Sequence, residues 1–127
     1  MEKIEKTVLV VEDEAMSRWI IANTLKRHGI PCLEAEHGKH ALEILSQNPC
    51  DFILTDLQMP EMDGVELIRT LREREKTTCD TPMPIVVLSA EKGEMIETAL
   101  QLGVHDYFIK SVPFESFMPR LKKLLST

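Results

Sequence analysis

The sequence predicts an α/β fold in which a parallel sheet of five strands carries helices on both faces. Short apolar runs rich in β-branched residues alternate five times with longer segments of helical period. The apolar runs are continuous, as in strands that are buried on both faces. A regular alternation of strands and helices favours parallel pairing with helical crossovers. The length suits one domain with one core, spanning residues 1–127.

The first half of the chain supplies three strands and two helices. The strands are expected at 7–11, 30–36 and 51–55. A helix over 14–28 gathers its apolar residues near one face: Met16, Ile20, Ile21 and Leu25. Gly29 then follows the helix, where a left-handed residue usually ends it. The second helix, at 38–47, brings together Ala41, Ile44 and Leu45.

The second half supplies two strands and three helices. The strands are expected at 84–89 and 106–110, and the helices at 63–75, 94–103 and within the tail 115–127. The helix at 63–75 turns Leu67, Ile68 and Leu71 inward, and the tail places Phe117, Leu121 and Leu124 on one face. The polar, proline-containing stretch 76–84 is expected to form a surface loop.

Composition narrows the class of protein. The formal net charge is −6 and the pI is about 5.2, which does not suit direct binding of nucleic acid. Cys32, Cys50 and Cys79 show no metal or redox spacing, so we interpret them as apolar fillers in a reducing compartment. The charged start of the chain resembles a true N-terminus without a signal peptide, and no apolar run could span a membrane. We therefore expect a cytoplasmic protein.

Polar and charged residues gather where the predicted strands end. Glu12 and Asp13 follow the first strand, Asp56 the third, Ser89 and Ala90 close the fourth, and Lys110 closes the fifth. The carboxyl ends of parallel strands share one edge of the sheet, where ligands of such folds bind. Any one of these residues alone is better explained as a turn, a helix cap or a surface side chain. Their joint position at one edge favours a site.

The chemistry of this set suits a cation and a phosphoryl group. Two carboxylates ~4 Å apart repel by about 4 kcal/mol at an effective dielectric of ~20. A divalent cation offsets that repulsion, and oxygen ligands favour Mg²⁺ or Mn²⁺ over zinc. The cation, Lys110 and Ser89 can then bind phosphoryl oxygens, and Asp56 can act as the nucleophile that forms an acyl phosphate.

Four stretches carry a resemblance to a known family. They are "VLVVEDE", "LTDLQMPEMDG", "PIVVLSA" and "YFIK". Together with the segments between them, they resemble the receiver domain of bacterial response regulators, the CheY-like phosphoacceptors of two-component signalling, over nearly the whole chain. The resemblance implies a flavodoxin-like sheet with strand order 2-1-3-4-5. It also implies a signalling domain that catalyses only its own phosphorylation and dephosphorylation, not a conventional enzyme.

The resemblance also implies a role for each site residue. Asp56 matches the phosphoacceptor and Lys110 the lysine that binds the phosphate. Ser89 and Tyr107 match a switch pair that responds to phosphorylation, beside the small Ala90. The Mg²⁺ ligands implied are Glu12, Asp13, Asp56 and the backbone carbonyl of Gln58.

The resemblance further implies partners. A histidine kinase or a histidine phosphotransfer protein donates the phosphoryl group, and a downstream protein reads the phosphorylated state. The face formed by the fourth helix, fifth strand and fifth helix, here 94–103, 106–110 and 115–127, changes shape and can form a homodimer. Neither nucleic acid nor a membrane is an expected direct partner.

The sequence departs from the family at Ser111, where a proline with a cis peptide bond is usual. Because a cis bond before a non-proline residue costs about 3 kcal/mol, we expect a trans Lys110–Ser111 bond. Pro119 is tolerated only in the first turn of a helix. The last helix is therefore expected to begin late, with Ser116 as its N-cap, or to kink near Pro119.

Two other functions are compatible with part of this pattern. A phosphatase like those of the haloacid dehalogenase superfamily needs a second aspartate two residues after the nucleophile, where this chain has Gln58. A pseudo-receiver, a binding module that is not phosphorylated, is expected to have lost acidic, hydroxyl or lysine residues of the site, and only Ser111 speaks for it. The four histidines and Trp19 show no ligand spacing and are expected to be structural or exposed.

Overall fold

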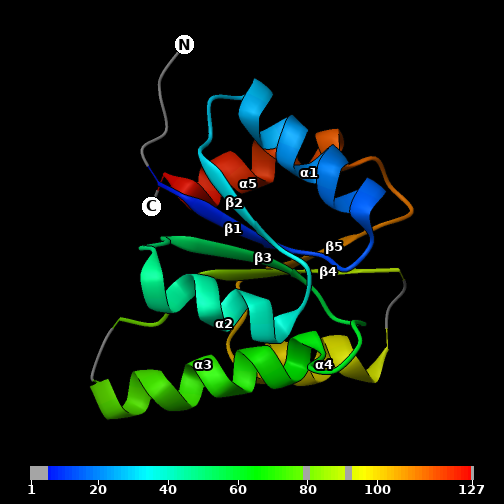
Figure 1. The fold of residues 1–127 in the computed structure, drawn as a ribbon. Coiled ribbons are helices and arrows are strands. Elements are labelled where there is room, and N and C mark those ends of the chain that lie inside the picture. The colour runs from blue at the N-terminus through cyan, green and yellow to red at the C-terminus, as the bar shows by residue number, and fades with distance from the viewer. Residues whose placement is uncertain (1–5, 79–80, 91–92, 127) are drawn as a thin grey trace.

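The computed structural model describes residues 6–78, 81–90 and 93–126, and these form a five-stranded sheet between two layers of helices (Figure 1). All strand pairs are parallel, in the order β2-β1-β3-β4-β5. The strands are β1 (Val8–Val11), β2 (Cys32–Ala35), β3 (Phe52–Asp56), β4 (Ile85–Ser89) and β5 (Asp106–Ile109). The expected flavodoxin-like fold with strand order 2-1-3-4-5 is confirmed.

The helices divide between the two faces of the sheet. In Figure 1, α1 and α5 cover one face, and α2, α3 and α4 cover the other. The helices are α1 (Ala15–Arg27), α2 (Gly38–Gln47), α3 (Gly64–Thr78), α4 (Glu94–Gln101) and α5 (Met118–Leu125). Helix α3 continues past its expected end at Glu75, into the stretch expected to be a loop. No helix among the described residues is both long enough and apolar enough to cross a membrane.

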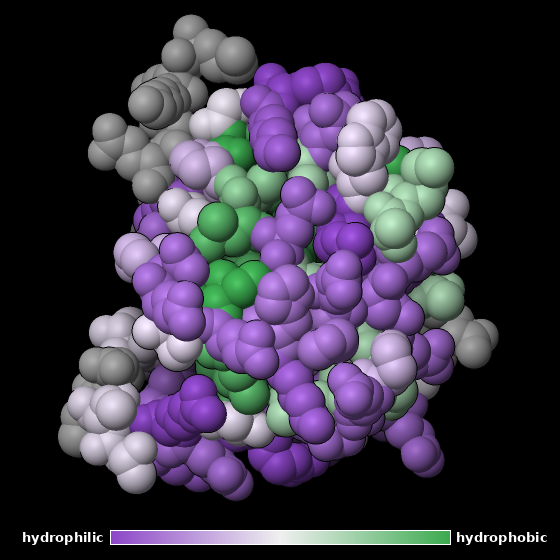
Figure 2. Space-filling model, viewed as in Figure 1, coloured by the Kyte–Doolittle hydropathy of each residue, from purple (hydrophilic) through white to green (hydrophobic). Residues whose placement is uncertain are grey.

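Alternate residues of each strand pack into two separate cores. Leu9, Ile53 and Val87 belong to the core beneath α2, α3 and α4. Val10, Leu54 and Phe108 belong to the core beneath α1 and α5. The central strands β1, β3 and β4 are buried along their whole length, which explains why their sequences are continuously apolar. Figure 2 shows a mostly hydrophilic surface, with a band of hydrophobic side chains along the sheet edge between α1 and α2.

The expected apolar face of the first helix is partly wrong. Ile21 and Leu25 are buried, but Met16 and Ile20 are 64% and 45% exposed. Each residue advances about 100° around a helix, so Ile20 lies well to one side of the stripe centred on Ile21 and Leu25. Ala22 and Thr24 complete that buried stripe instead. Trp19 is exposed, as expected.

The C-terminal helix begins late, as expected for a helix that contains Pro119 near its start. A short 3₁₀ helix, η1 (Phe114–Phe117), precedes it, and Pro119 occupies its first turn. The expectation that Ser116 caps it is wrong: Phe117 holds the N-cap position. The hydroxyl of Ser116 donates instead to the carbonyl of Pro113 within the preceding turn. The described chain contains no cis peptide bond, so the Lys110–Ser111 bond is trans.

Arg72 joins three segments at the edge of the sheet opposite the carboxyl ends of the strands. Its guanidinium donates to the carbonyls of Leu102 (2.7 Å) and Gly103 (3.2 Å), which end α4, and to the carbonyl of Met83 (3.1 Å) before β4. Glu75 pairs with Arg72 at 2.9 Å and accepts from the Met83 N–H. The C-terminal end of α4 is therefore fastened to α3.

The histidines and cysteines mostly serve the fold. His28 contacts Glu115 at 2.7 Å, while His37 and His40 accept hydrogen bonds from nearby main-chain N–H groups. Cys32 and Cys50 are free and half-buried, and burial raises the pKa of both thiols. Cys79 lies outside the described residues.

We predict that Gly64→Ala destabilises the protein. A Cβ at this position would lie 2.2 Å from the carbonyl oxygen of Asp56, so the backbone must shift. Overpacking of this kind costs about 1–3 kcal/mol of unfolding free energy, measurable by urea denaturation. Gly93→Ala is the matched control, because nothing lies within 4 Å of its added Cβ. Equal stability of the two variants would contradict the prediction.

We also predict slow alkylation of Cys32 and Cys50. The thiolate is the reactive form, and a raised pKa leaves fewer thiolates at a given pH. Iodoacetamide at about pH 8, near the ordinary thiol pKa, is expected to modify both residues more slowly in the folded protein than in urea. Peptide mass spectrometry reads each site separately, and equal rates in both states would refute the expectation.

Candidate functional site

The strand pattern delivers three of the candidate residues to the same face of the sheet. Glu12, Asp56 and Lys110 each lie two positions after a residue of the core beneath α1 and α5, namely Val10, Leu54 and Phe108. Successive side chains of a strand alternate between its faces, so these three continue the direction of that core. Where the apolar row stops at the carboxyl ends of the strands, a charged row begins.

Three carboxylates converge at this end of the sheet. One oxygen each from Glu12, Asp13 and Asp56 lies within 4.8 Å of the others. Glu12 is 0% exposed and Asp56 is 5% exposed, whereas Asp13 faces solvent. The cluster is therefore a largely buried pair of acids with a third at its mouth.

Lys110 supplies the balancing charge. Its ammonium donates to Asp56 Oδ2 at 2.8 Å and lies 2.6 Å from Glu12 Oε2. The residue lies one position past β5, where its main-chain N–H donates to the carbonyl of Ser89 at 2.7 Å. The substitution at Ser111 therefore leaves the Lys110 amine in contact with both buried acids.

Burial and charge shift the pKa values of two groups at the site. Burial raises the pKa of Glu12 to about 7, and the Asp56 charge adds to that rise, while Lys110 works against it. Burial lowers the pKa of Lys110, but its close contacts with the Asp56 and Glu12 carboxylates outweigh this and raise the pKa. The site thus holds more negative charge than its own ammonium balances.

The residues present fit a divalent cation. Three carboxylates against one ammonium leave an excess of two negative charges when all are ionised. Among the described residues, no donor points at the buried Oε2 of Glu12 in good hydrogen-bonding geometry, although Lys110 is close. An all-oxygen donor set of this charge suits Mg²⁺ or Mn²⁺.

The remaining candidates lie in β4, in β5 and in the loop after Asp56. Ser89 ends β4 and is 9% exposed, beside a cavity of about 220 Å³ that Gln58 and Ala90 also line. Gln58 lies two residues after Asp56 in the loop, and its main-chain N–H donates to Asp56 Oδ1 at 3.3 Å. Tyr107 is half-buried in β5 and packs on the core beneath α4.

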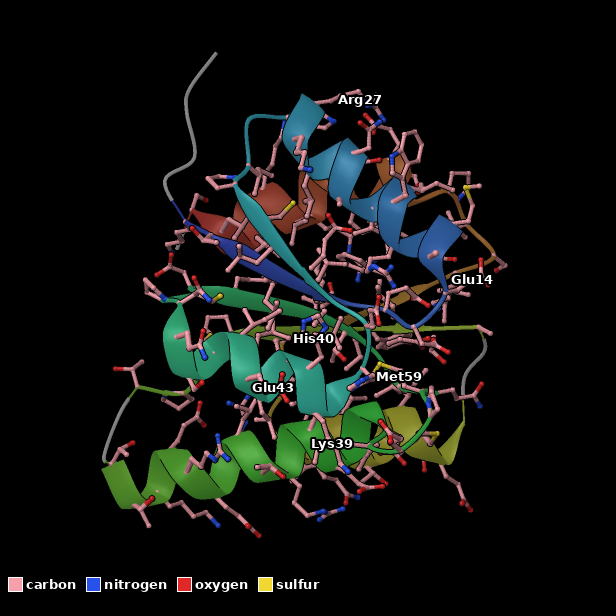
Figure 3. All side chains as sticks on the ribbon, viewed as in Figure 1. Glu14, Arg27, Lys39, His40, Glu43 and Met59 are labelled. Atoms are coloured by element: carbon pink, nitrogen blue, oxygen red, sulfur yellow. The ribbon has the colours of Figure 1, made fainter. Side chains whose placement is uncertain are left out.

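The loop after Asp56 is held close to the acid by its own backbone. The N–H of Gly64 donates to the carbonyl of Leu57 at 2.8 Å, and Asp63 Oδ1 accepts from the Glu66 N–H at the start of α3. Met59 from this loop and Glu14 from the first turn after β1 lie at the same end of the sheet (Figure 3).

Arg18 was not among the residues singled out from the sequence. Its Nη1 donates to the main-chain carbonyl of Glu12 at 2.8 Å, and its side chain is 16% exposed. The available signal was its position five residues after Asp13, near the start of a helix that begins at the site.

Comparison with known proteins agrees with this geometry. A model of the response regulator receiver domain family matches residues 8–122. The chain is 38% identical over 123 residues to a chemotaxis protein CheY homolog of Campylobacter jejuni, with 94% of this chain and 92% of the relative covered.

Solved structures share the fold. A response regulator receiver protein from Pseudomonas putida superposes with a TM-score of 0.83 at 29% identity, covering 97% of this chain and 98% of the other. Response regulator TrrA from Thermotoga maritima, solved in complex with Mg²⁺ and BeF, gives a TM-score of 0.80 at 27% identity, covering 94% and 98%.

We predict that Lys110→Met destabilises the metal-free protein. Removal of the ammonium leaves two buried carboxylates uncompensated, at a cost of about 1–3 kcal/mol. Saturating Mg²⁺ is expected to reduce the difference in unfolding free energy between the variant and the unaltered protein, because a cation bound to the folded state replaces the lost charge. Urea unfolding with EDTA and with Mg²⁺ measures both effects. Lys123→Met, which removes an exposed lysine, is the control. Equal unfolding free energies of Lys110→Met and the unaltered protein in EDTA would contradict the prediction.

Proposed function

The chain belongs to the response regulator receiver family, the CheY-like phosphoacceptors of two-component signalling, and from this premise we propose that Asp56 accepts the phosphoryl group. The observation that carries the proposal is the nearly buried Asp56 carboxylate, held by the Lys110 ammonium beside two further acids. A receiver domain is a signalling protein and not a conventional enzyme. We propose that residues 1–127 form one such domain.

The acidic cluster is suited to the cation that the family uses. Receiver domains bind Mg²⁺ at their acidic site, and the Glu12, Asp13 and Asp56 cluster is present in this chain. We assign the ligands to these three carboxylates and to the backbone carbonyl of Gln58. When bound, Mg²⁺ or Mn²⁺ supplies positive charge that neutralises phosphoryl oxygens.

The reaction follows from the groups around Asp56. A carboxylate oxygen of Asp56 attacks the phosphorus of a phosphohistidine, the P–N bond breaks, and the imidazole leaves with its electron pair and takes up a proton. Lys110, already bound to Asp56, stabilises the negative charge of the transferred group. Ser89 lies at the adjacent strand end, where its hydroxyl can donate to a phosphoryl oxygen.

The switch is supported by strand register. Val87 pairs with Tyr107 across β4 and β5, and Ser89 lies two residues further along β4, so Ser89 and Tyr107 share one face of the sheet. That face lies beneath α4. Movement of Ser89 toward a phosphoryl group frees space on this face for Tyr107, which shifts a pre-existing equilibrium at the surface formed by α4, β5 and α5.

The phosphodonor has a surface next to the site. Receiver domains interact with histidine kinases, and we assign the donor here to a histidine kinase or a histidine phosphotransfer protein. An apolar hollow of about 200 Å³ lies between α1 and the segment after β5, lined in part by Ile20, Lys110 and Phe114. Of its apolar lining residues, Ile20 and Val112 are exposed. Since Lys110 also borders Asp56, a donor seated here has its histidine close to the acceptor.

The output is assigned to a downstream protein that contacts the surface of α4, β5 and α5. Leu100 on α4 is 45% exposed and provides an apolar contact there, for such a partner or for a second copy of the chain. The negative net charge speaks against direct binding of nucleic acid. A cytoplasmic location fits the free, unpaired thiols of Cys32 and Cys50.

The alternative of a pseudo-receiver receives little support. Its one sequence signal is Ser111, and the trans bond before Ser111 leaves Lys110 within 2.8 Å of Asp56. The strand ends carry all the groups that the family uses: the three carboxylates, the hydroxyl of Ser89 and the ammonium of Lys110.

Intact mass after incubation with acetyl phosphate tests the proposal. We expect the mass of one phosphoryl group to be gained with Mg²⁺, little gain in EDTA, and none in Asp56→Asn. Asp51→Asn, an exposed aspartate whose side chain accepts from the Thr7 N–H, is the matched control and is expected to be modified normally. Folded protein that gains no mass with any small phosphodonor would instead identify a pseudo-receiver.

A further inference from the structure

Arg18 turns back from α1 toward the end of β1 and binds the turn that carries the acidic pair. Its Nη1 donates to the carbonyl of Glu12 at 2.8 Å, and only 16% of its side chain is exposed. The hydrogen bond spans six residues, from the second turn of the helix to the last residue before Asp13. A largely buried guanidinium that donates to a main-chain carbonyl acts on backbone geometry more than on surface charge.

Hydrogen bonds hold the main chain of Glu12 on both sides of its Cα. Its N–H donates to the carbonyl of Ala35 in the neighbouring strand at 3.0 Å, and its carbonyl accepts from Arg18. The Glu12 side chain also accepts from the Glu14 N–H at 3.3 Å. With Glu12 fixed at both ends, Asp13 leaves the strand in a set direction, and the two carboxylates converge with Asp56.

Two glutamates keep the guanidinium in this position. Glu34 Oε1 lies 3.6 Å from Arg18 Nε, and Glu36 Oε1 lies 3.8 Å from Nη2. Glu34 lies in β2 and Glu36 directly after it, next to the end of β1. Both compensate the charge of the Arg18 guanidinium.

We propose that Arg18 is a positioning residue for the divalent-cation site, acting through the Glu12 carbonyl. The inference rests on the proposed function, because it concerns the cation bound by the same carboxylates. Groups that orient metal ligands without touching the metal typically contribute 10–100-fold to affinity. Arg18 holds the backbone of one ligand, and we place its contribution near the lower limit, at about tenfold.

Electrostatics alone predicts the opposite result. Removal of Arg18 deletes a positive charge and leaves Glu34 and Glu36 uncompensated, which makes the neighbourhood more attractive to a cation. A positioning role predicts weaker Mg²⁺ binding, whereas a purely electrostatic role predicts tighter binding. The sign of the change therefore separates the two roles.

Calorimetric titration of Mg²⁺ into the unphosphorylated protein is the decisive experiment. We expect Arg18→Met to raise the dissociation constant about tenfold and Arg18→Lys, which keeps a charged donor, to give an intermediate value. Arg27→Ala is the matched control: it removes an arginine at the C-terminal end of the same helix, 59% exposed and away from the site (Figure 3). It is expected to leave the constant unchanged.

A second measurement separates positioning from general loss of structure. With acetyl phosphate, Arg18→Met is expected to need more Mg²⁺ for half-maximal phosphorylation but to reach the plateau rate of the unaltered protein. An unchanged or lower dissociation constant in folded Arg18→Met overturns the proposal, even if the melting temperature falls. Absence of Mg²⁺ binding by the unaltered protein would overturn both this inference and the proposed site. Mg²⁺ binding by the unaltered protein, together with an unchanged affinity in folded Arg18→Met, overturns the inference alone.

Discussion

The compensation of negative charge at the carboxyl ends of the strands is the constraint on which the site depends. Glu12 and Asp56 are two nearly buried acids; burial raises the pKa of Glu12 to about 7, and the charge of Asp56 adds to that rise. Burying charged carboxylates lowers the free energy of unfolding, and the Lys110 ammonium offsets only part of that loss. The negative charge that Lys110 does not neutralise is what attracts a divalent cation, and the cation in turn attracts the oxygens of a phosphoryl group. The residues of the site thus lower the stability of the fold at the place where the chemistry occurs.

The sheet makes that cluster with few residues because its geometry aligns them. A parallel sheet brings every carboxyl end to one edge, and strand alternation turns Glu12, Asp56 and Lys110 to the same side. Ser89 falls on the other side of the sheet, beneath α4. The close approach of Gly64 to the Asp56 carbonyl keeps the intervening loop over the acid. Position in the strand thus decides which face of the sheet each of these side chains meets.

The parts of the structure that follow from local pattern could be predicted from the sequence. Continuous apolar runs located the strands, and the polar residues after them located the site, because both depend on period and position. The exposed Met16 and Ile20 could not be placed correctly, since which stripe of α1 is buried depends on how the helix sits on the sheet. Phe117 rather than Ser116 precedes α5 because a 3₁₀ turn uses the Ser116 hydroxyl. The contact of Arg18 could not be predicted either, because Arg18 donates to a main-chain carbonyl, and every residue type carries one.

The Arg72 clamp determines how α4 is able to move. Arg72 holds the carbonyls of Leu102 and Gly103 just past the C-terminal end of α4, whereas Gly93 at the N-terminal end makes no side-chain capping bond. The cavity beside Ser89 opens at that N-terminal end. A rod fastened at one end is a lever, and its displacement grows with distance from the fulcrum. If Ser89 acts as the proposed switch, we therefore expect its movement to tilt α4 rather than translate it, with the largest displacement in the first turn of the helix.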